Sequence, residues 1–453
     1  MNIFEKTLEI YKDTYICLYC LGRMFSMLAT HTTNYERGKS LLLSITMEKH
    51  GTYLSNISES SENAINYIKI LAENANFIPA QQVLEKEGYT FEKKENISSC
   101  FLCKDLFKDL ARFINKPKKA LKDLEFNNIL VGCSPDPKII NREDKFKGKH
   151  SLLNSESFKS HFNREMGKIL SEELGKPAKF ENPDIVIIFT FNKDTYTIEL
   201  MIRSLYIYGR YKKLIRGIPQ TKWPCSNCNG KGCKECDYTG KLYQTSVEEL
   251  ISPEFLKAAS ASDSTFHGAG REDIDVRMLG TGRPFVLELE NPKKRDLDLE
   301  SLRERTNKAN EGKIEILNLR YSDKDEVRRI KAEAENTKKR YRALCESQDP
   351  IEKNQFEIKL KEAKESLENK IINQRTPHRV SHRRSDKIRK KKIYVLEGEF
   401  ITPDQFQFEI ETQGGTYIKE LISGDEGRTS PSLTELFGNQ LSCINLDVME
   451  IKY

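Results

Sequence analysis

Four pairs of cysteines at metal-site spacing constrain the fold of this chain more than any other feature. Eight of its eleven cysteines lie in Cys-x-x-Cys pairs, and the densest group consists of Cys225, Cys228, Cys233 and Cys236. Zinc prefers four thiolates in a tetrahedron, and each pair supplies two from one tight turn. Gly230 and Gly232 allow the backbone between the pairs to fold back on itself. The sequence therefore predicts a metal site; redox use of one pair is the alternative, although no thioredoxin-like pattern accompanies either.

The other two pairs lie about eighty residues apart and consist of Cys17, Cys20, Cys100 and Cys103. Their spacing alone supports a shared zinc ion less strongly than that of the first group. With four protein ligands and no open position, either site would be structural rather than catalytic. Such a site would stabilise a helical region that has a small apolar core of its own.

Free thiols at this spacing favour a reducing compartment over a secreted, disulfide-bonded chain. The first residues, MNIFEK, contain neither the basic segment nor the small-residue cleavage site of a secretion signal. No run of eighteen apolar residues exists, so we expect no membrane span. We therefore expect a cytoplasmic protein that does not contact a membrane. Its 453 residues predict about two to four domains.

The spacing of apolar residues changes along the chain and predicts several domains. Residues 1–75 carry apolar side chains at three- and four-residue spacing, which indicates helices. Residues 157–174 have the pattern of an amphipathic helix between short apolar runs, which is typical of an α/β module. The strands expected for that module are 128–131, 184–191 and 195–207.

The C-terminal half has the pattern of a mixed sheet with surface helices. We expect a helix over 248–259 and a charge-rich surface helix over 352–372. The strands predicted for this sheet are 313–320, 341–346, 392–399 and 406–412. No internal repeat of solenoid length is visible.

Residues 266–285 combine four glycines with a dense set of charges. Glycines allow a backbone to approach a ligand closely. The order of residues, however, matches neither a dinucleotide-binding nor a phosphate-binding loop. Taken alone, the segment is more typical of a charged surface loop than of a functional site.

Positive charge is concentrated in one short segment, although the net charge of +6 is modest for the length. Residues 375–392 contain one acid, Asp386, against nine basic residues: Arg375, Arg379, Arg383, Arg384, Lys387, Arg389, Lys390, Lys391 and Lys392. Such a segment can follow a nucleic-acid backbone and release counterions. A solvated or targeting-type basic run is the alternative on composition alone.

Several segments resemble the motifs of pseudouridine synthases and occur in the same order. They are Gly270-Arg271-Glu272-Asp273, Lys339-Arg340-Tyr341-Arg342-Ala343 and Thr416-Tyr417-Ile418-Lys419-Glu420-Leu421. Two more, at 375–379 and 424–431, are similar to segments of one branch of that family. The branch comprises the archaeal and eukaryotic tRNA pseudouridine synthases with an appended THUMP domain, which act on uridines 54 and 55 of the tRNA T-loop. The resemblance extends to the cysteine pairs and covers essentially the whole chain.

The resemblance implies a role for individual residues. Asp273 corresponds to the catalytic aspartate, with Arg271 close to it. Tyr341 corresponds to the tyrosine that stacks on the target base, and the third motif places Tyr417 and Lys419 beside the aspartate. The basic segment would be a loop that closes over the RNA, with the RNA-binding residues Arg375, Arg379, Arg383 and Arg384.

The chemistry of the reaction suits these residues. Isomerisation breaks an N-glycosidic bond, turns the base and rejoins it through carbon, with no redox change and no small-molecule cofactor. It requires a carboxylate near the sugar, as nucleophile or as base, and the sequence leaves both roles open. Arg271 or Lys419 could keep that carboxylate ionised. Asp275 is an alternative to Asp273, because residues two apart in a strand share a face; the Arg-x-Asp spacing of the family favours Asp273.

The resemblance also implies an α+β multidomain fold with a pseudouridine synthase mixed-sheet catalytic domain. We expect a helical zinc-binding region (1–103), an α/β THUMP-like RNA-binding domain (104–212), a four-cysteine zinc insert (213–246) and the catalytic domain (247–453). The partner would be tRNA, bound at its T-arm by the catalytic domain and at its acceptor end by the THUMP-like domain.

A non-catalytic, zinc-containing tRNA-binding protein or RNA chaperone is the second hypothesis. A protein that only binds RNA needs no carboxylate in a cationic pocket, which argues against it. A THUMP-linked methyltransferase is a third hypothesis. It would require a glycine-rich strand–helix cofactor loop with a downstream acid, and the sequence contains none.

Overall fold

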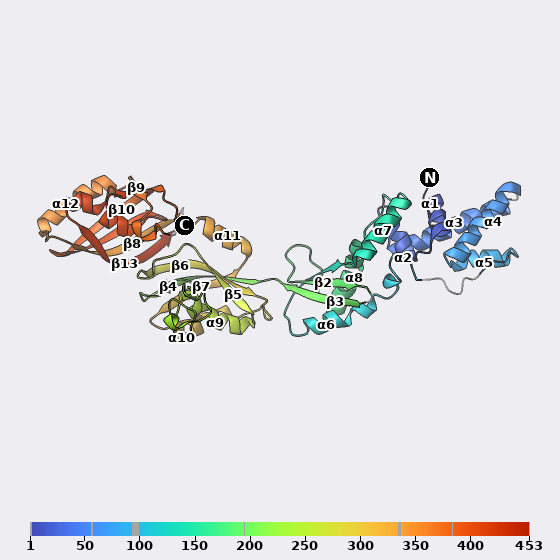
Figure 1. Ribbon diagram of the computed structural model, residues 1–453, viewed down its shortest axis with the longest axis horizontal. Helices are drawn as coiled ribbons and strands as arrows, with labels where there is room; N and C mark the ends of the chain where they lie inside the picture. The colour runs from blue at the N-terminus through green and yellow to red at the C-terminus, as the bar shows by residue number, and fades with distance from the viewer. Residues whose placement is uncertain are drawn as a thin grey trace. The chain divides into compact units, whose positions relative to one another are not determined.

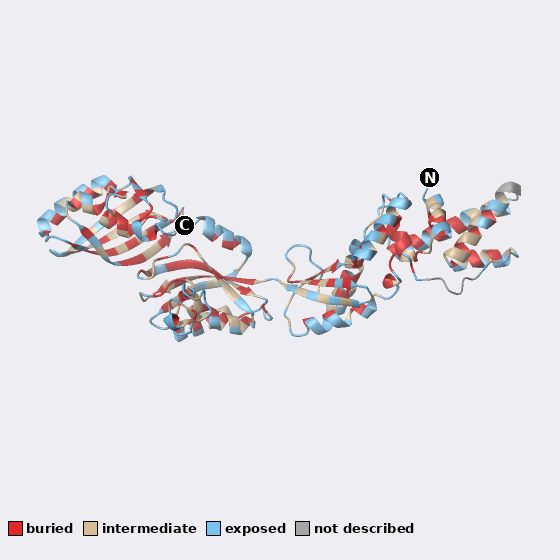
Figure 2. Cartoon of the chain, in the orientation of Figure 1, coloured by how far each residue is buried: buried red, intermediate tan, exposed pale blue. Residues whose placement is uncertain are grey.

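The structure is a computed structural model that describes residues 2–55, 58–92, 99–193, 195–333, 337–382 and 384–452. It divides into two compact units, Met1–Arg203 and Ser204–Tyr453 (Figure 1). In both units the buried residues lie where helices and sheets face one another (Figure 2). Within the described ranges, no helix is both long enough and apolar enough to cross a membrane.

Unit 1 begins with a group of helices, as the apolar spacing predicted. They are α1 (Ile3–Asp13), α2 (Leu18–Met24), α3 (Asn34–Leu54), α4 (Ser58–Asn74) and α5 (Ile78–Lys86). The side chain of Thr33 accepts a hydrogen bond from the Glu36 amide, and this capping box starts α3. A Cβ atom at Gly22 would lie 1.7 Å from the carbonyl oxygen of Asn34, so only glycine allows α2 and α3 to pack this closely.

The second part of unit 1 is an α/β module. After the short helices η1 (Leu106–Lys108), η2 (Ala111–Phe113) and α6 (Asn115–Leu121) come β1 (Ile129–Ser134), α7 (Pro137–Lys149), α8 (Phe158–Leu174), β2 (Ile185–Asn192) and β3 (Thr195–Ile202). β1 pairs with β2 in parallel and β2 with β3 antiparallel. The predicted helix over 157–174 is confirmed. It begins after the N-cap Ser157, and its buried residues include Phe158, Phe162, Met166 and Leu170, four residues apart.

The prediction of one strand over 195–207 was wrong. β3 ends at Ile202, and a separate strand, β4 (Leu205–Lys213), pairs with β6 and β7 in unit 2. Apolar alternation reports which face of a strand is buried, but not which sheet the strand joins. Unit 2 accordingly begins at Ser204, before the expected end of the THUMP-like domain at residue 212.

Unit 2 contains a mixed ten-stranded sheet. Its order is β12-β9-β10-β11-β8-β13-β6-β4-β7, with β5 paired to β6. The strands besides β4 are β5 (Asp263–Gly268), β6 (Arg277–Glu290), β7 (Ile314–Ser322), β8 (Lys338–Ser347), β9 (Ile371–Arg375), β10 (Ile388–Thr402), β11 (Gln405–Gln413), β12 (Thr429–Ser430) and β13 (Leu441–Lys452). The four predicted strands of this half are confirmed. Among the described strands of this sheet, β13 and β6 form the one parallel pair, which joins two antiparallel halves.

Unit 2 also contains helices, several of which pack against this sheet. They are η3 (Lys234–Cys236), α9 (Val247–Ala259), α10 (Leu299–Ala309), α11 (Lys324–Ala332), α12 (Lys353–Leu367), η5 (His378–Val380), α13 (Ile418–Ser423) and α14 (Leu433–Phe437). The helix predicted over 248–259 is confirmed as α9. The helix predicted over 352–372 is too long: it ends at Leu367, residues 368–370 form a turn, and β9 begins at Ile371. Asn369 has a left-handed backbone with φ of 58°, which is incompatible with a continuous helix.

Candidate active site and cysteine clusters

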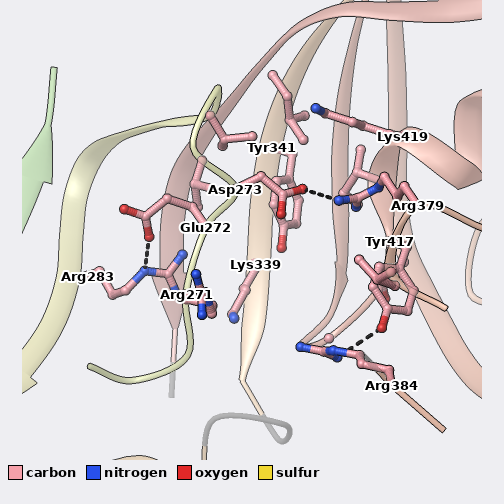
Figure 3. A pocket seen from close by; sticks show the side chains of 17 residues that line it. Arg271, Glu272, Asp273, Arg283, Lys339, Tyr341, Arg379, Arg384, Tyr417 and Lys419 are labelled. Carbon is pink, nitrogen blue, oxygen red and sulfur yellow. Dashed lines mark hydrogen bonds and ion pairs between the residues drawn. The ribbon is translucent and has the colours of Figure 1, made fainter. Parts of the chain in front are cut away.

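A pocket of about 260 Å³ lies in unit 2 where the loop between β5 and β6 meets β8, β13 and the start of α13 (Figure 3). Seven residues predicted from four separate segments line it: Arg271, Asp273, Tyr341, Arg379, Arg384, Tyr417 and Lys419. Asp275 and Arg375 are not among the lining residues, and Arg383 lies outside the described residues. The fold therefore brings together residues that are up to 148 positions apart in the sequence.

The two candidate aspartates occupy different environments. Both lie in the loop between β5 and β6, so the expectation that they share one face of a strand was wrong. Asp273 lines the pocket, and its Oδ2 atom lies 2.8 Å from Nη1 of Arg379. Asp275 instead pairs with Lys419, and this amine lowers the pKa of the Asp275 carboxyl against the effect of burial. Each carboxylate thus has its own cation.

The cation beside Asp273 is neither of the two that the sequence suggested. Arg379, which we expected only to bind RNA, donates hydrogen bonds to the buried Glu420 on α13 as well as forming the ion pair with Asp273. Arg271 instead places its guanidinium 5.3 Å from the centre of the Trp223 ring. The basic loop between β9 and β10 therefore contributes directly to the electrostatics of the pocket.

Buried charges fix the backbone of the loop that carries Asp273. The Glu272 carboxylate is buried and accepts hydrogen bonds from Nε of Arg283 at 2.7 Å and from the Tyr211 hydroxyl at 2.9 Å. From β4, the buried amine of Lys213 donates to the carbonyl oxygens of Asp273 and Ile274. Sequence reasoning missed these residues. The one available signal was the position of Glu272 inside the recognised motif.

We expect Glu272→Ala to lower the free energy of unfolding of unit 2 by about 3–5 kcal/mol, because it leaves Arg283 buried without a counter-ion. Urea unfolding followed by the fluorescence of Trp223, the single tryptophan, measures this change. Glu304→Ala on the exposed side of α10 is the control, and should change stability by less than about 0.5 kcal/mol. Equal stabilities of the two variants would contradict the role given to the buried pair.

The two tyrosines enter the pocket from different elements. Tyr341 on β8 is 8% exposed, and burial raises its pKa to about 12, so its hydroxyl stays protonated. Tyr417 precedes α13, and its hydroxyl accepts a hydrogen bond from Nη1 of Arg384 at 2.9 Å (Figure 3). The side-chain amide of Gln374 donates a hydrogen bond to the carbonyl oxygen of Tyr417 and accepts one from its N–H. The basic loop is therefore attached to the pocket at Asp273 and at Tyr417.

The basic segment is only partly a loop. Residues 376–387 connect the strands, whereas the lysines at its end belong to β10. Lys391 is buried and donates to the carbonyl oxygen of Gly414. Arg375 pairs with Asp386 of the same loop and is 52% exposed. The segment is therefore not one continuous loop, and the RNA-binding role of its basic residues stays a prediction.

Both cysteine groups have the geometry of a tetrahedral metal site. Within each group of four, all sulfur atoms lie within 4.8 Å of one another. The Sγ atoms of Cys17 and Cys103 are 3.7 Å apart, and those of Cys225 and Cys233 are 3.9 Å apart. Four sulfurs at about 2.3 Å from a zinc ion are about 3.8 Å from one another, so these sites fit the ion. The fold brings the pairs at residues 17–20 and 100–103 together, as the sequence suggested.

Comparisons with known proteins decide the family. A family described as "Pus10, C-terminal" matches residues 206–452, and "Pus10 THUMP domain, archaeal" matches residues 113–190. The chain belongs to the Pus10 family. The tRNA pseudouridine synthase Pus10 of Methanocaldococcus jannaschii is 42% identical, with 98% of this chain and 93% of that protein covered. For the Pus10 of Methanothrix thermoacetophila the identity is 39%, with 96% and 91% covered.

Among solved structures, a Cbf5-Nop10-Gar1 complex matches with 16% identity and a TM-score of 0.29, covering 54% of this chain and 48% of that one. Membership of the Pus10 family instead rests on the sequence matches. It makes the chain a tRNA pseudouridine synthase, which is an isomerase, and its substrate is RNA. The hypothesis of a non-catalytic binding protein is therefore wrong. The expected fold class, a mixed-sheet synthase domain with a THUMP domain, is confirmed.

Proposed function

We propose that this Pus10-family enzyme isomerises uridines of the tRNA T-loop, at position 54, 55 or both, with Asp273 as the catalytic carboxylate. The observation that carries the proposal is the placement of Asp273 in one pocket with Tyr341 and the cation of Arg379. The ion pair sets a positive charge beside the carboxylate that would act as a nucleophile or a base at the sugar. Asp275, outside the pocket, positions Lys419.

The size and lining of the pocket support binding of one extruded nucleotide. A volume of about 260 Å³ admits a single base but not a base pair. The target must therefore leave its stack, which costs least in a single-stranded loop. Stacking of the extruded base on the Tyr341 ring would offset this cost by about 1–3 kcal/mol. Arg271 and Arg384 at the rim are suited to phosphate oxygens of the same strand.

We infer that both cysteine groups hold structural zinc and that the THUMP region binds the acceptor end of the tRNA. The first inference rests on the sulfur geometry. The amides of Gly232 and Gly240 also donate to the sulfurs of Cys228 and Cys236, which favours thiolates. The second rests on the archaeal THUMP match at residues 113–190. The proposed organisation remains a helical zinc region, a THUMP-like domain, a zinc insert and a catalytic domain.

Mapping pseudouridine on an unmodified tRNA transcript tests the substrate. We expect the purified chain to modify the T-loop and no other position, as detected by carbodiimide treatment and primer extension. Transcripts with cytidine at position 54 or at 55 separate the two targets and serve as controls. Modification outside the T-loop would contradict the proposed target, and absence of pseudouridine would contradict activity on tRNA.

A further inference from the structure

One lysine of the pocket has no hydrogen-bond or ion-pair partner among the residues that the structure describes. Lys339 lies on β8 two residues before Tyr341, on the same core-facing side of the strand, and only 6% of it is exposed. It lines the pocket, and Figure 3 shows it beside Tyr341. No carboxylate or carbonyl oxygen among the described residues accepts a hydrogen bond from its Nζ atom. An ammonium group is rarely buried in this way unless a ligand completes its environment.

The groups around Lys339 are mostly cationic. A Cβ atom at Gly270 would lie 3.3 Å from Nη1 of Arg283 and 3.5 Å from Nζ of Lys339, so both cations converge on one glycine. Glu272 compensates Arg283 directly, and Lys391 on β10 adds a further positive charge. Burial is the largest cause that lowers the pKa of Lys339, to about 7; Arg283 and Lys391 also lower it, and Glu272 opposes them.

Other buried lysines of unit 2 show what a purely structural role looks like. The Lys213 amine donates to three carbonyl oxygens, those of Ile218, Asp273 and Ile274. The Lys391 amine donates to the carbonyl oxygen of Gly414. Both amines hold backbone in place. The Lys339 amine has no such acceptor among the described residues and faces the pocket instead.

We propose that Lys339 donates a hydrogen bond from Nζ to a carbonyl oxygen of the target uracil and stabilises the detached base. This inference rests on the proposed function. A strand rises about 3.3 Å per residue, so Lys339 and Tyr341 lie about 7 Å apart along β8. A base stacked on the Tyr341 ring therefore presents its edge within reach of the lysine amine.

The movement of electrons and protons in the reaction indicates the step at which this amine would act. When the bond between C1′ and N1 breaks, both electrons remain on the uracil, whose negative charge spreads over N1 and the carbonyl oxygens. The base then turns, C5 forms the bond to C1′, C5 loses its proton and N1 gains one. The product is an isomer of the substrate, and no oxidant or reductant is needed. A fixed cation at a carbonyl oxygen stabilises the charge that develops during the first step.

Single-turnover kinetics of Lys339→Met and Lys339→Arg test the proposal. Excess enzyme is mixed with a tRNA transcript carrying tritium at C5 of uridine, and tritium release is followed. We expect Lys339→Met to lower the saturated rate about 10²–10³-fold with less than about threefold change in the Kd for tRNA. Lys339→Arg should restore the rate to within about tenfold. Lys338→Met is the matched control, because Lys338 is exposed on the opposite face of β8, over the Tyr394 ring; its rate should be unchanged.

A pH profile separates this role from a structural one. Lys339 stabilises the anion only when protonated, so the wild-type rate at limiting tRNA should fall as pH rises above about 7. The rate of Lys339→Arg at limiting tRNA should not change over the same pH range. If Lys339→Met fails to fold, the comparison between the wild type and Lys339→Arg still tests the proposal. The proposal would be overturned if Lys339→Met had the wild-type rate, or if it bound tRNA more weakly with an unchanged saturated rate. Parallel pH profiles of the wild type and Lys339→Arg would also overturn it. An inactive wild type would contradict the proposed function instead.

Discussion

We expect Asp273→Asn to abolish pseudouridine formation, whereas Asp275→Asn should retain most of it. Asparagine keeps the shape of Asp273 but can neither attack the sugar nor accept its proton, so the rate should fall about 10⁴-fold or more. The Asp275 carboxylate is 62% exposed, and exposed ion pairs contribute at most about 1 kcal/mol. Loss of its contact with Lys419 should therefore reduce the rate less than about tenfold. Tritium release from C5-labelled tRNA measures both rates.

Two controls make the comparison of the aspartates informative. Urea unfolding followed by Trp223 fluorescence shows whether each variant is folded, and the Kd for tRNA shows whether it still binds. Full activity in Asp273→Asn would assign catalysis to another residue. Equal losses in the two folded variants would contradict the separate environments seen for the two carboxylates.

The second large effect concerns the N-terminal cysteine cluster. We expect about two zinc ions per chain, and Cys20→Ser should lower that number to about one and unfold the helical part of unit 1. The apparent free energy of structural zinc binding is about 10–16 kcal/mol in zinc-finger peptides, which is as large as the total stability of a typical domain. Metal analysis, far-UV circular dichroism and protease sensitivity measure the outcome.

Cys133→Ser is the matched control for this prediction. Cys133 is also buried in unit 1, at 3% exposure, but lies on β1 outside the cluster. This variant should keep both zinc ions and its helical content. Fewer than one zinc ion in the wild-type chain, or an unchanged zinc content in Cys20→Ser, would contradict a structural metal at this cluster.

Patterns of apolar residues predicted several elements because they report burial of one face. The helix at 157–174 and four strands of unit 2 followed from these patterns, whereas β5, β6, β9, β12 and β13 were not predicted. Only two polar residues, Arg203 and Ser204, separate β3 from β4, and so short an interruption does not by itself mark the end of a strand. Which sheet each strand joins depends on pairings with residues far along the chain, and these leave no local signal.

The composition of the site was predictable from its motifs, but its ion pairs were not. Asp273 and Arg379 are 106 positions apart, and only the fold shows that they touch. The resemblance of 375–379 to a family segment singled out Arg379, but it did not indicate which carboxylate Arg379 contacts. Lys339 lies in a strand next to exposed lysine and arginine residues, and its burial became visible only once its face of β8 was known.

β13, near the middle of the ten-stranded sheet, is also the last of the sheet's described strands to be synthesised. All of unit 1 has left the ribosome long before residues 441–452, so it can fold while translation continues. The two halves of the sheet in unit 2 cannot be joined until β13 has been synthesised, because it lies between β8 and β6. Because β13 also supplies Leu446 and Val448 to the pocket, a nascent chain without this strand lacks part of the candidate active site. If the proposed site is the catalytic one, we expect modification of tRNA only after translation has passed this strand.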